Sequence, residues 1–80
     1  MKVLIYSKRG CHYCRQAKQL SRHMKYKTRV VDLSDPEHFE TLRWFELEGY
    51  STVPQVFVDG EHVGGFNEFE KFVKNKEFRG

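Results

Sequence analysis

This sequence of 80 residues has few of the features that mark secreted, membrane-spanning or disordered proteins. It has only two cysteines, too few and too close together for the disulfide framework of a small secreted domain. No apolar run approaches the roughly 20 residues of a membrane-spanning helix, and a signal peptide's apolar stretch and cleavage site are missing. Hydrophobic residues make up 39% of the chain, too many for a disordered segment. We therefore expect a single domain over residues 1–80, cytoplasmic and without a membrane partner.

Acidic residues are absent from the first 31 positions, which carry nine lysines and arginines. The rest of the chain holds five basic and eleven acidic residues, so the two parts have charges of +9 and −6, which add to the net +3. Such a basic segment suggests an anionic partner, usually nucleic acid. The basic positions of the first predicted helix, however, lack interleaved aromatic residues for base stacking. We interpret them as a solvated helix face and expect no nucleic-acid partner.

The hydrophobic pattern predicts the element order β-α-β-α-β-β-α. The strands are expected over residues 2–6, 28–33, 55–58 and 61–63, and the helices over 13–24, from 34 to near 49, and from 67 onward. A β-α-β unit has parallel strands, whereas the pair Asp59-Gly60 favours a type I′ turn between antiparallel strands. The expected fold class is therefore α/β, a four-stranded mixed sheet with helices packed on it.

Side-chain patterns also predict where the helices begin and which faces they bury. Ser34 is the expected N-cap of the second helix, with Glu37 closing a capping box, and Asn67 and Glu70 repeat this pattern in the third. The expected apolar faces consist of Ala17, Leu20, Ser21 and Met24 in the first helix, Phe39, Leu42 and Phe45 in the second, and Phe69, Phe72 and Val73 in the third.

The two cysteines lie where the first strand gives way to the first helix. A sulfur at a helix N-terminus faces unpaired backbone N–H groups and the positive end of the helix dipole. Together with the nearby basic residues Lys8, Arg9 and Arg15, this environment is expected to lower the pKa of Cys11 below the ~8.5 of a free thiol. Cys11 is therefore the predicted nucleophile. Cys14, one turn into the helix and less exposed, is the predicted resolving thiol.

Other interpretations of this cysteine pair carry less weight. A structural zinc site needs four ligands, and the sequence has neither a second cysteine pair nor histidines at the usual spacing, so no metal is expected. A purely structural disulfide is disfavoured because so short a loop gains little entropy and the cytoplasm is reducing. For His12, two readings stay open: an exposed spacer, or a protonated neighbour that stabilises the Cys11 thiolate.

Three motifs together resemble those of the glutaredoxin family, dithiol class, within the thioredoxin-fold superfamily. They are Cys11-His-Tyr-Cys14 after the first strand, Thr52-Val-Pro54 before the third, and Gly64-Gly-Phe66 after the fourth, and they span nearly the whole chain. The resemblance implies a thioredoxin-like fold with sheet order 2-1-3-4 and a cis peptide before Pro54. This sequence departs from the family pattern at His12, where dithiol members usually carry proline, and at Asn67-Glu68, where many carry aspartate.

The resemblance also implies which residues bind substrate. In this family the loop before the third strand faces the reactive cysteine, and backbone pairing at the position of Val53 would hold glutathione. Backbone N–H groups at the start of the third helix would bind the carboxylate of its γ-glutamyl end, and Glu68 its ammonium group. The implied catalytic residues are Cys11 and Cys14, and the implied substrate-binding residues are Lys8, Tyr13, Thr52, Val53, Pro54, Gly65, Phe66, Asn67 and Glu68.

The function implied is glutathione-dependent thiol–disulfide oxidoreduction, with glutathione as co-substrate and no permanently bound cofactor. The expected partners are disulfide-containing or glutathionylated proteins, such as ribonucleotide reductase, and the default oligomeric state is a monomer. One alternative is a glutaredoxin-like redoxin reduced by thioredoxin reductase, although such proteins commonly differ at residues 64–67. The other is a glutathione-assisted iron–sulfur cluster binding module, against which the second thiol, Cys14, counts.

Overall fold

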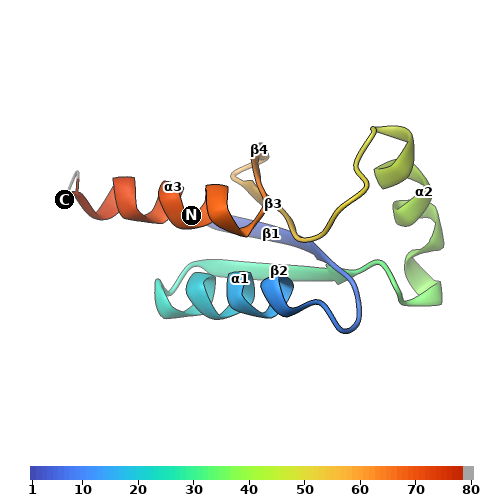
Figure 1. The fold of residues 1–80 in the computed structure, drawn as a ribbon, viewed down its shortest axis with the longest axis horizontal. Coiled ribbons are helices and arrows are strands. Elements are labelled where there is room, and N and C mark those ends of the chain that lie inside the picture. Colours follow the sequence, from blue (N-terminus) through green and yellow to red (C-terminus); the bar gives the residue numbers. More distant parts are fainter. Residues whose placement is uncertain (79–80) are drawn as a thin grey trace.

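The computed structural model describes residues 1–78, and its element order is the predicted one with a short 3₁₀ helix added. The strands of its sheet follow the order β2-β1-β3-β4, which confirms the predicted thioredoxin-like arrangement (Figure 1). No helix in the described part of the chain has the length and apolar character needed to cross a membrane. In chain order the elements are β1 (Lys2–Ser7), α1 (His12–His23), β2 (Lys27–Asp32), η1 (Pro36–His38), α2 (Phe39–Leu47), β3 (Gln55–Val58), β4 (Glu61–Gly64) and α3 (Phe66–Phe78).

Strand pairing follows from how the strands are connected. β1 and β2, joined through α1, run parallel, whereas β3 is antiparallel to both β1 and β4. Asp59 and Gly60 both have positive φ angles, 49° and 86°, as a type I′ turn requires. The predicted hairpin is confirmed, and it aligns Phe57 with His62 across the two strands.

One face of the sheet is covered by α1 and α3, which form the larger core with it. Alternate residues of β1, Val3 and Ile5, point into this core, where they meet Ala17 of α1 and Phe69 of α3, all of them almost completely buried. Ser21, on the same face of α1, is also buried, and its hydroxyl is hydrogen-bonded to that of Thr28 at 2.5 Å. The predicted inner faces of the first and third helices are confirmed.

A second cluster lies on the other face of the sheet, at its α2 end. Figure 1 shows α2 beyond the end of the sheet at which β1 and β2 finish, apart from α1 and α3. Phe45 of α2 packs there against Tyr6, with ring centroids 5.7 Å apart, and against Tyr50 at 5.1 Å. Burial raises the pKa of Tyr6 above its ordinary value near 10, and the opposing effect of the Arg29 charge is smaller.

The start of α2 differs from the prediction in two ways. Asp35, not Ser34, caps the segment: its carboxylate accepts from the backbone N–H of Glu37 at 3.0 Å, and one turn of 3₁₀ helix precedes α2. Phe39 is 59% exposed and does not share the buried face with Phe45. The physical reason is that each three-residue step falls about 60° short of a full helical turn, so two such steps rotate Phe39 about 120° away from Phe45.

The start of α3 also differs from the prediction. The helix begins at Phe66, one residue before the predicted cap Asn67. Glu68, not Glu70, reaches back, and its Oε1 accepts from the backbone N–H of Gly65 at 2.8 Å. This is the return half of a capping box: because the helix begins at Phe66, Glu68 and not Glu70 is its third residue, and Gly65 has no side chain to supply the other half.

Candidate active site

Cys11 is the N-cap residue of α1, as the sequence predicts. Its backbone is extended, with φ −90° and ψ 112°, and its Sγ accepts from the backbone N–H of Cys14 at 3.1 Å. The sulfur therefore takes the place of the serine or aspartate oxygen that usually caps a helix. Because a thiolate accepts this bond more strongly than a thiol and faces the positive end of the helix dipole, the cap favours ionised Cys11 once the pair is reduced.

Cys11 and Cys14 are joined by a disulfide, with their Cα atoms 5.3 Å apart. Cys14 is only 1% exposed, whereas Cys11 is partly exposed. The Sγ of Cys11 also lies 3.7 Å from the carbonyl oxygen of Val53, on the loop before β3. An external sulfur can therefore reach Cys11 but not Cys14, and the roles of nucleophile and resolving thiol stay predictions.

A cavity of about 230 Å³ lies beside this pair and gathers most of the predicted substrate-binding residues. Three segments supply its walls: the start of α1, the loop before β3 and the start of α3. The peptide bond between Val53 and Pro54 is cis, as the resemblance implies. The lining residues are Tyr13, Thr52, Val53, Pro54, Gly65, Phe66, Asn67 and Glu68.

The end of this cavity formed by α3 is built around a close backbone approach. Gly64 has a φ of +130°, and a Cβ atom placed there would lie 2.9 Å from the Glu68 side chain. The bond between Glu68 and Gly65 leaves the N–H groups of Phe66 and Asn67 as first-turn donors, which have no acceptor within the helix. Beside them Tyr13 and Phe66 stack with ring centroids 6.1 Å apart. Backbone donors, an aromatic pair and the Glu68 carboxylate thus lie together at this end of the cavity.

The basic residues near Cys11 lie on the surface around the site. Lys8, Arg9 and Arg15 are exposed, and no acidic group lies within ion-pair distance of them among residues 1–76, whose side chains are described. Lys8 does not line the cavity. His12 is exposed too, and its Nε2 lies 3.1 Å from the Gln16 amide nitrogen. The influence of His12 on the Cys11 thiolate stays a prediction.

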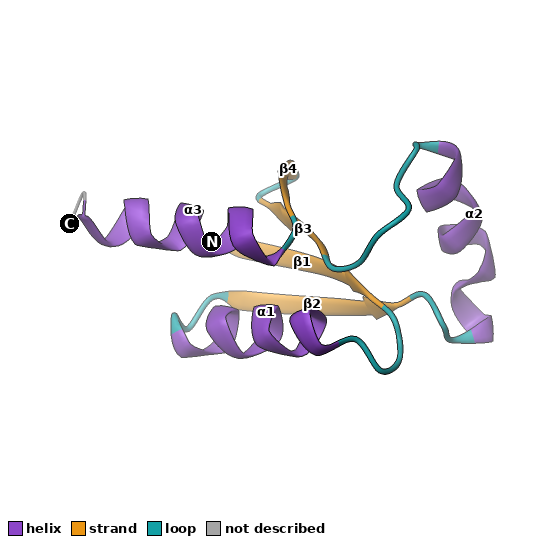
Figure 2. Cartoon of the chain, in the orientation of Figure 1, coloured by secondary structure: helices purple, strands orange, loops and turns teal. Residues whose placement is uncertain are grey.

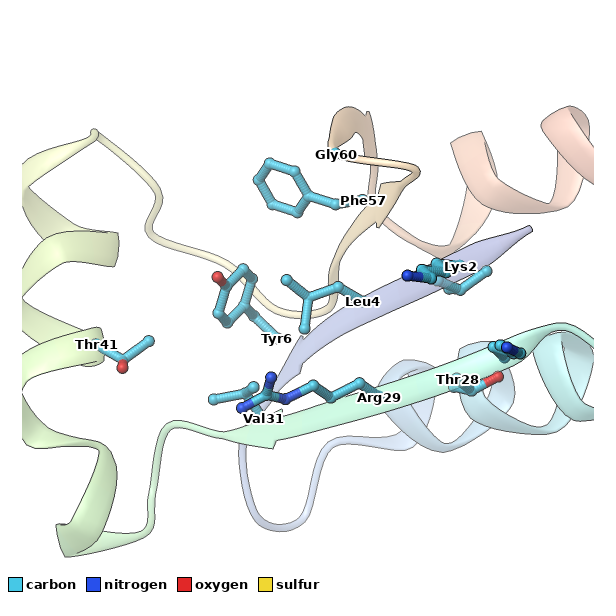
Figure 3. A pocket seen from close by; sticks show the side chains of 11 residues that line it. Lys2, Leu4, Tyr6, Thr28, Arg29, Val31, Thr41, Phe57 and Gly60 are labelled. Carbon is cyan, nitrogen blue, oxygen red and sulfur yellow. The ribbon is translucent and has the colours of Figure 1, made fainter.

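A second and larger groove, of about 580 Å³, lies on the face of the sheet opposite α1 and α3 (Figure 3). Leu4, Tyr6 and Phe57 point into it from two strands, with Arg29 beside them. None of the predicted site residues lines it. We therefore place the site at the smaller cavity, whose lining residue Val53 contacts the Sγ of Cys11.

Comparison with known proteins agrees with this geometry. The glutaredoxin family model matches residues 3–63. The chain belongs to the glutaredoxin family. A glutaredoxin from Vibrio cholerae is 36% identical over 84 residues, covering 92% of this chain and 92% of that protein. Glutaredoxin-C4 of Arabidopsis thaliana is 38% identical over 69 residues, which cover 84% of this chain but only 51% of that protein, so this chain spans about half of its length.

A solved structure of a buckwheat glutaredoxin–glutathione complex superposes with a TM-score of 0.75 at 27% identity, covering 92% of this chain and 70% of that one. Membership of the glutaredoxin family and the bonded Cys11–Cys14 pair together support thiol–disulfide oxidoreductase chemistry at this site.

The structure adds side-chain contacts that the sequence analysis did not predict, and two of the residues involved, Gln55 and His62, were not among its site residues. Gln55 donates to both the carbonyl and the hydroxyl oxygen of Thr52, and His62 bonds to Gln55 in turn. Ser34 Oγ accepts from the backbone N–H of Arg9 at 2.8 Å and so ties the loop before Cys11 to the segment after β2. The contact of His62 could have been predicted from the sequence, because the expected turn places His62 opposite Phe57 and therefore diagonal to Gln55.

Proposed function

We propose that this protein is a glutathione-dependent thiol–disulfide oxidoreductase that reduces protein disulfides and protein–glutathione mixed disulfides. The observation that carries the proposal is the position of Cys11: its sulfur caps α1, and Val53 of the lined cavity lies within 3.7 Å of it. The glutathione complex of the buckwheat relative supports glutathione as the co-substrate. We further propose that the protein works as a monomer in the cytoplasm, with ribonucleotide reductase among its possible acceptors.

With a glutathionylated protein, the Cys11 thiolate attacks the glutathione sulfur. A Cys11–glutathione disulfide forms, the original disulfide breaks, and the protein thiolate leaves and is protonated. A second glutathione thiolate then attacks the glutathione sulfur of this adduct, which yields oxidised glutathione and free Cys11. The incoming glutathione is the reductant: the disulfide bond passes from the protein–glutathione pair to the two glutathione sulfurs, and the protein sulfur is left as a thiol.

With a protein disulfide, Cys11 first forms a mixed disulfide with one sulfur of the substrate. Cys14 then attacks the sulfur of Cys11, the reduced dithiol of the substrate leaves, and a Cys11–Cys14 disulfide remains. Two glutathione molecules reduce that disulfide in sequence. This route needs both cysteines, whereas removal of glutathione from a protein needs only Cys11.

Substitution of each cysteine tests this assignment. We expect Cys11→Ser to abolish both reactions, because no other exposed thiol remains, and Cys14→Ser to keep the reduction of a glutathionylated peptide while losing the reduction of a protein disulfide. Turnover is measured as NADPH oxidation with glutathione and glutathione reductase. The opposite pattern would exchange the two roles.

The same assay separates the two possible reductants. With the wild-type protein we expect turnover with glutathione and glutathione reductase, and none when thioredoxin reductase alone replaces them. Turnover with thioredoxin reductase alone would instead support the redoxin alternative. Mock reactions without the protein provide the baseline for each reductase.

A further inference from the structure

A chain of side-chain hydrogen bonds runs from β4 to the loop before β3. The amide nitrogen of Gln55 lies 3.1 Å from the carbonyl oxygen of Thr52 and 3.2 Å from its hydroxyl oxygen. The amide oxygen of Gln55 lies 2.7 Å from the Nε2 atom of His62. We call these three residues, Thr52, Gln55 and His62, the loop relay.

The direction of every bond in the loop relay is determined by one acceptor. The carbonyl oxygen of Thr52 can only accept, so the nitrogen end of the Gln55 amide must face it. The oxygen end of Gln55 then faces His62, which must donate through its Nε2–H. The relay therefore uses both ends of the amide and specifies the tautomer of His62.

The far end of the relay rests on aromatic rings. The imidazole of His62 packs against two rings that also contact each other: its centroid lies 5.1 Å from that of Tyr50 and 5.0 Å from that of Phe57, which lies opposite His62 in the hairpin. Tyr50 in turn contacts the buried Phe45. His62 and the hydrogen bonds of the relay are exposed to solvent, but because the two rings pack on the cluster under α2, one side of the imidazole rests on the body of the protein.

The near end of the relay lies in a part of the site that has no regular secondary structure. Residues 51–54 belong to neither a helix nor a strand, and Figure 2 draws them within the loop that joins α2 to β3. Among the hydrogen bonds of the described residues, the two that Thr52 accepts both come from the Gln55 amide. The next residue, Val53, faces the sulfur of Cys11 through its carbonyl.

We propose that Gln55 and His62 are positioning residues that hold Thr52 so that the backbone of Val53 presents its edge to a peptide-like thiol substrate. The inference rests on the proposed function, in which the backbone of Val53 pairs with that of glutathione. It extends that function to two side chains, of which Gln55 lies at the first position of β3 and His62 on β4, both outside the cavity lining. The relay supports recognition of the peptide backbone and leaves the reactivity of Cys11 unchanged.

The test compares two disulfides that differ in whether they carry a peptide backbone. In a Cys14→Ser background, reduced Cys11 attacks oxidised glutathione, a Cys11–glutathione disulfide accumulates, and one glutathione thiolate leaves and is protonated. The second oxidant is an aromatic dipyridyl disulfide, which has no backbone to pair with Val53. Rates are measured by rapid quenching and mass spectrometry for glutathione, and by release of the coloured pyridinethione for the dipyridyl compound.

We expect Gln55→Ala to slow the reaction with oxidised glutathione about threefold to tenfold, the worth of roughly one hydrogen bond, and to leave the dipyridyl rate unchanged. His62→Leu removes the donor and should act in the same direction, whereas His62→Gln keeps an N–H donor and should restore most of the rate. The matched control is Glu61→Ala, an exposed neighbour on β4 without a described side-chain hydrogen bond. Thermal unfolding shows whether each variant is folded.

The outcomes separate this proposal from the function on which it rests. Equal glutathione rates for wild type and Gln55→Ala would overturn the relay, and so would a parallel loss with both disulfides, which indicates a general structural role. If His62→Gln restores the glutathione rate that His62→Leu loses, the relay is supported. If the Cys14→Ser protein with an intact relay reacts with the dipyridyl disulfide but not with oxidised glutathione, the proposed function itself is overturned.

Discussion

At the residue scale, Glu68 combines an observed structural role, the cap of α3, with a proposed one, pairing with the ammonium group of glutathione. One oxygen caps α3 by accepting from the N–H of Gly65, and the residue also lines the cavity. A capping interaction needs only an acceptor, whereas pairing with an ammonium group gains from a negative charge. The two roles of Glu68 can therefore be separated by substitutions that remove the charge and the acceptor independently.

We predict that Glu68→Gln keeps the stability of the protein within about 0.5 kcal/mol but raises the KM for glutathione about twofold to fivefold, the range of an exposed ion pair. Glu68→Ala should raise the KM equally and also lower the unfolding free energy by about 1 kcal/mol, the usual cost of a lost cap. Urea unfolding and steady-state kinetics measure the two effects. An unchanged KM in Glu68→Gln would remove the ammonium contact from the proposed site.

At the scale of elements, the short helix α2 packs at one end of the sheet mainly through its buried face. Phe45 is 1% exposed within the aromatic cluster, whereas Phe39, which begins the same helix, is 59% exposed. The two residues are chemically identical and lie six positions apart. They therefore provide a matched pair for measuring how much of the attachment depends on the buried face.

We predict that Phe45→Ala lowers the unfolding free energy by about 3–5 kcal/mol, as for other buried phenylalanines replaced by alanine. Phe39→Ala should change it by no more than about 0.5 kcal/mol, because little apolar surface is uncovered. Denaturant unfolding followed by circular dichroism compares the two. A large loss for Phe39→Ala would mean that α2 buries both rings in solution.

For the whole molecule, the uneven charge distribution is the dominant electrostatic feature. The first 31 residues contain the strand end, loop and helix that position Cys11, and they carry nine positive charges without a negative one. Glutathione is an anion near neutral pH, so this part of the surface attracts it, with a range of about 10 Å at 0.1 M salt. Attraction over so short a range depends on where each lysine lies relative to the site.

Substitution of two exposed lysines in this basic part can distinguish local attraction of glutathione near the site from attraction by the net charge. Lys8 lies in the loop before Cys11, whereas Lys27 begins β2, at the end of the sheet where it pairs with Lys2. We predict that Lys8→Ala lowers kcat/KM for glutathione about twofold to fivefold at low salt and less at high salt, while Lys27→Ala has a smaller effect. Steady-state kinetics at two ionic strengths provide the measurement. Equal effects of both substitutions would assign the attraction to net charge alone.

Local rules in the sequence were sufficient for much of this structure. The turn at Asp59-Gly60, the inner faces of α1 and α3, and the position of Cys11 at the start of a helix all follow from backbone preferences or from a periodic pattern within one element. The grouping of eight predicted residues around one cavity also agrees with the sequence, because three motifs in a known order imply a known fold. Their roles as substrate contacts stay predictions.

Tertiary structure decided what local rules leave degenerate. Ser34 and Asp35 are both residue types that cap helices well. Asp35 is the cap in the structure, because the Ser34 hydroxyl instead accepts from the backbone N–H of Arg9, 25 positions away. Phe39 fits an apolar pattern, but only the rotation of α2 against the sheet determines which rings are buried. The loop relay likewise joins β4 to the loop through a diagonal contact between strands. By itself the sequence determined the order of elements and the reactive pair, because both depend on neighbouring residues; the tertiary structure decided the caps, the face of α2 and the support of the loop, because these depend on contacts between distant ones.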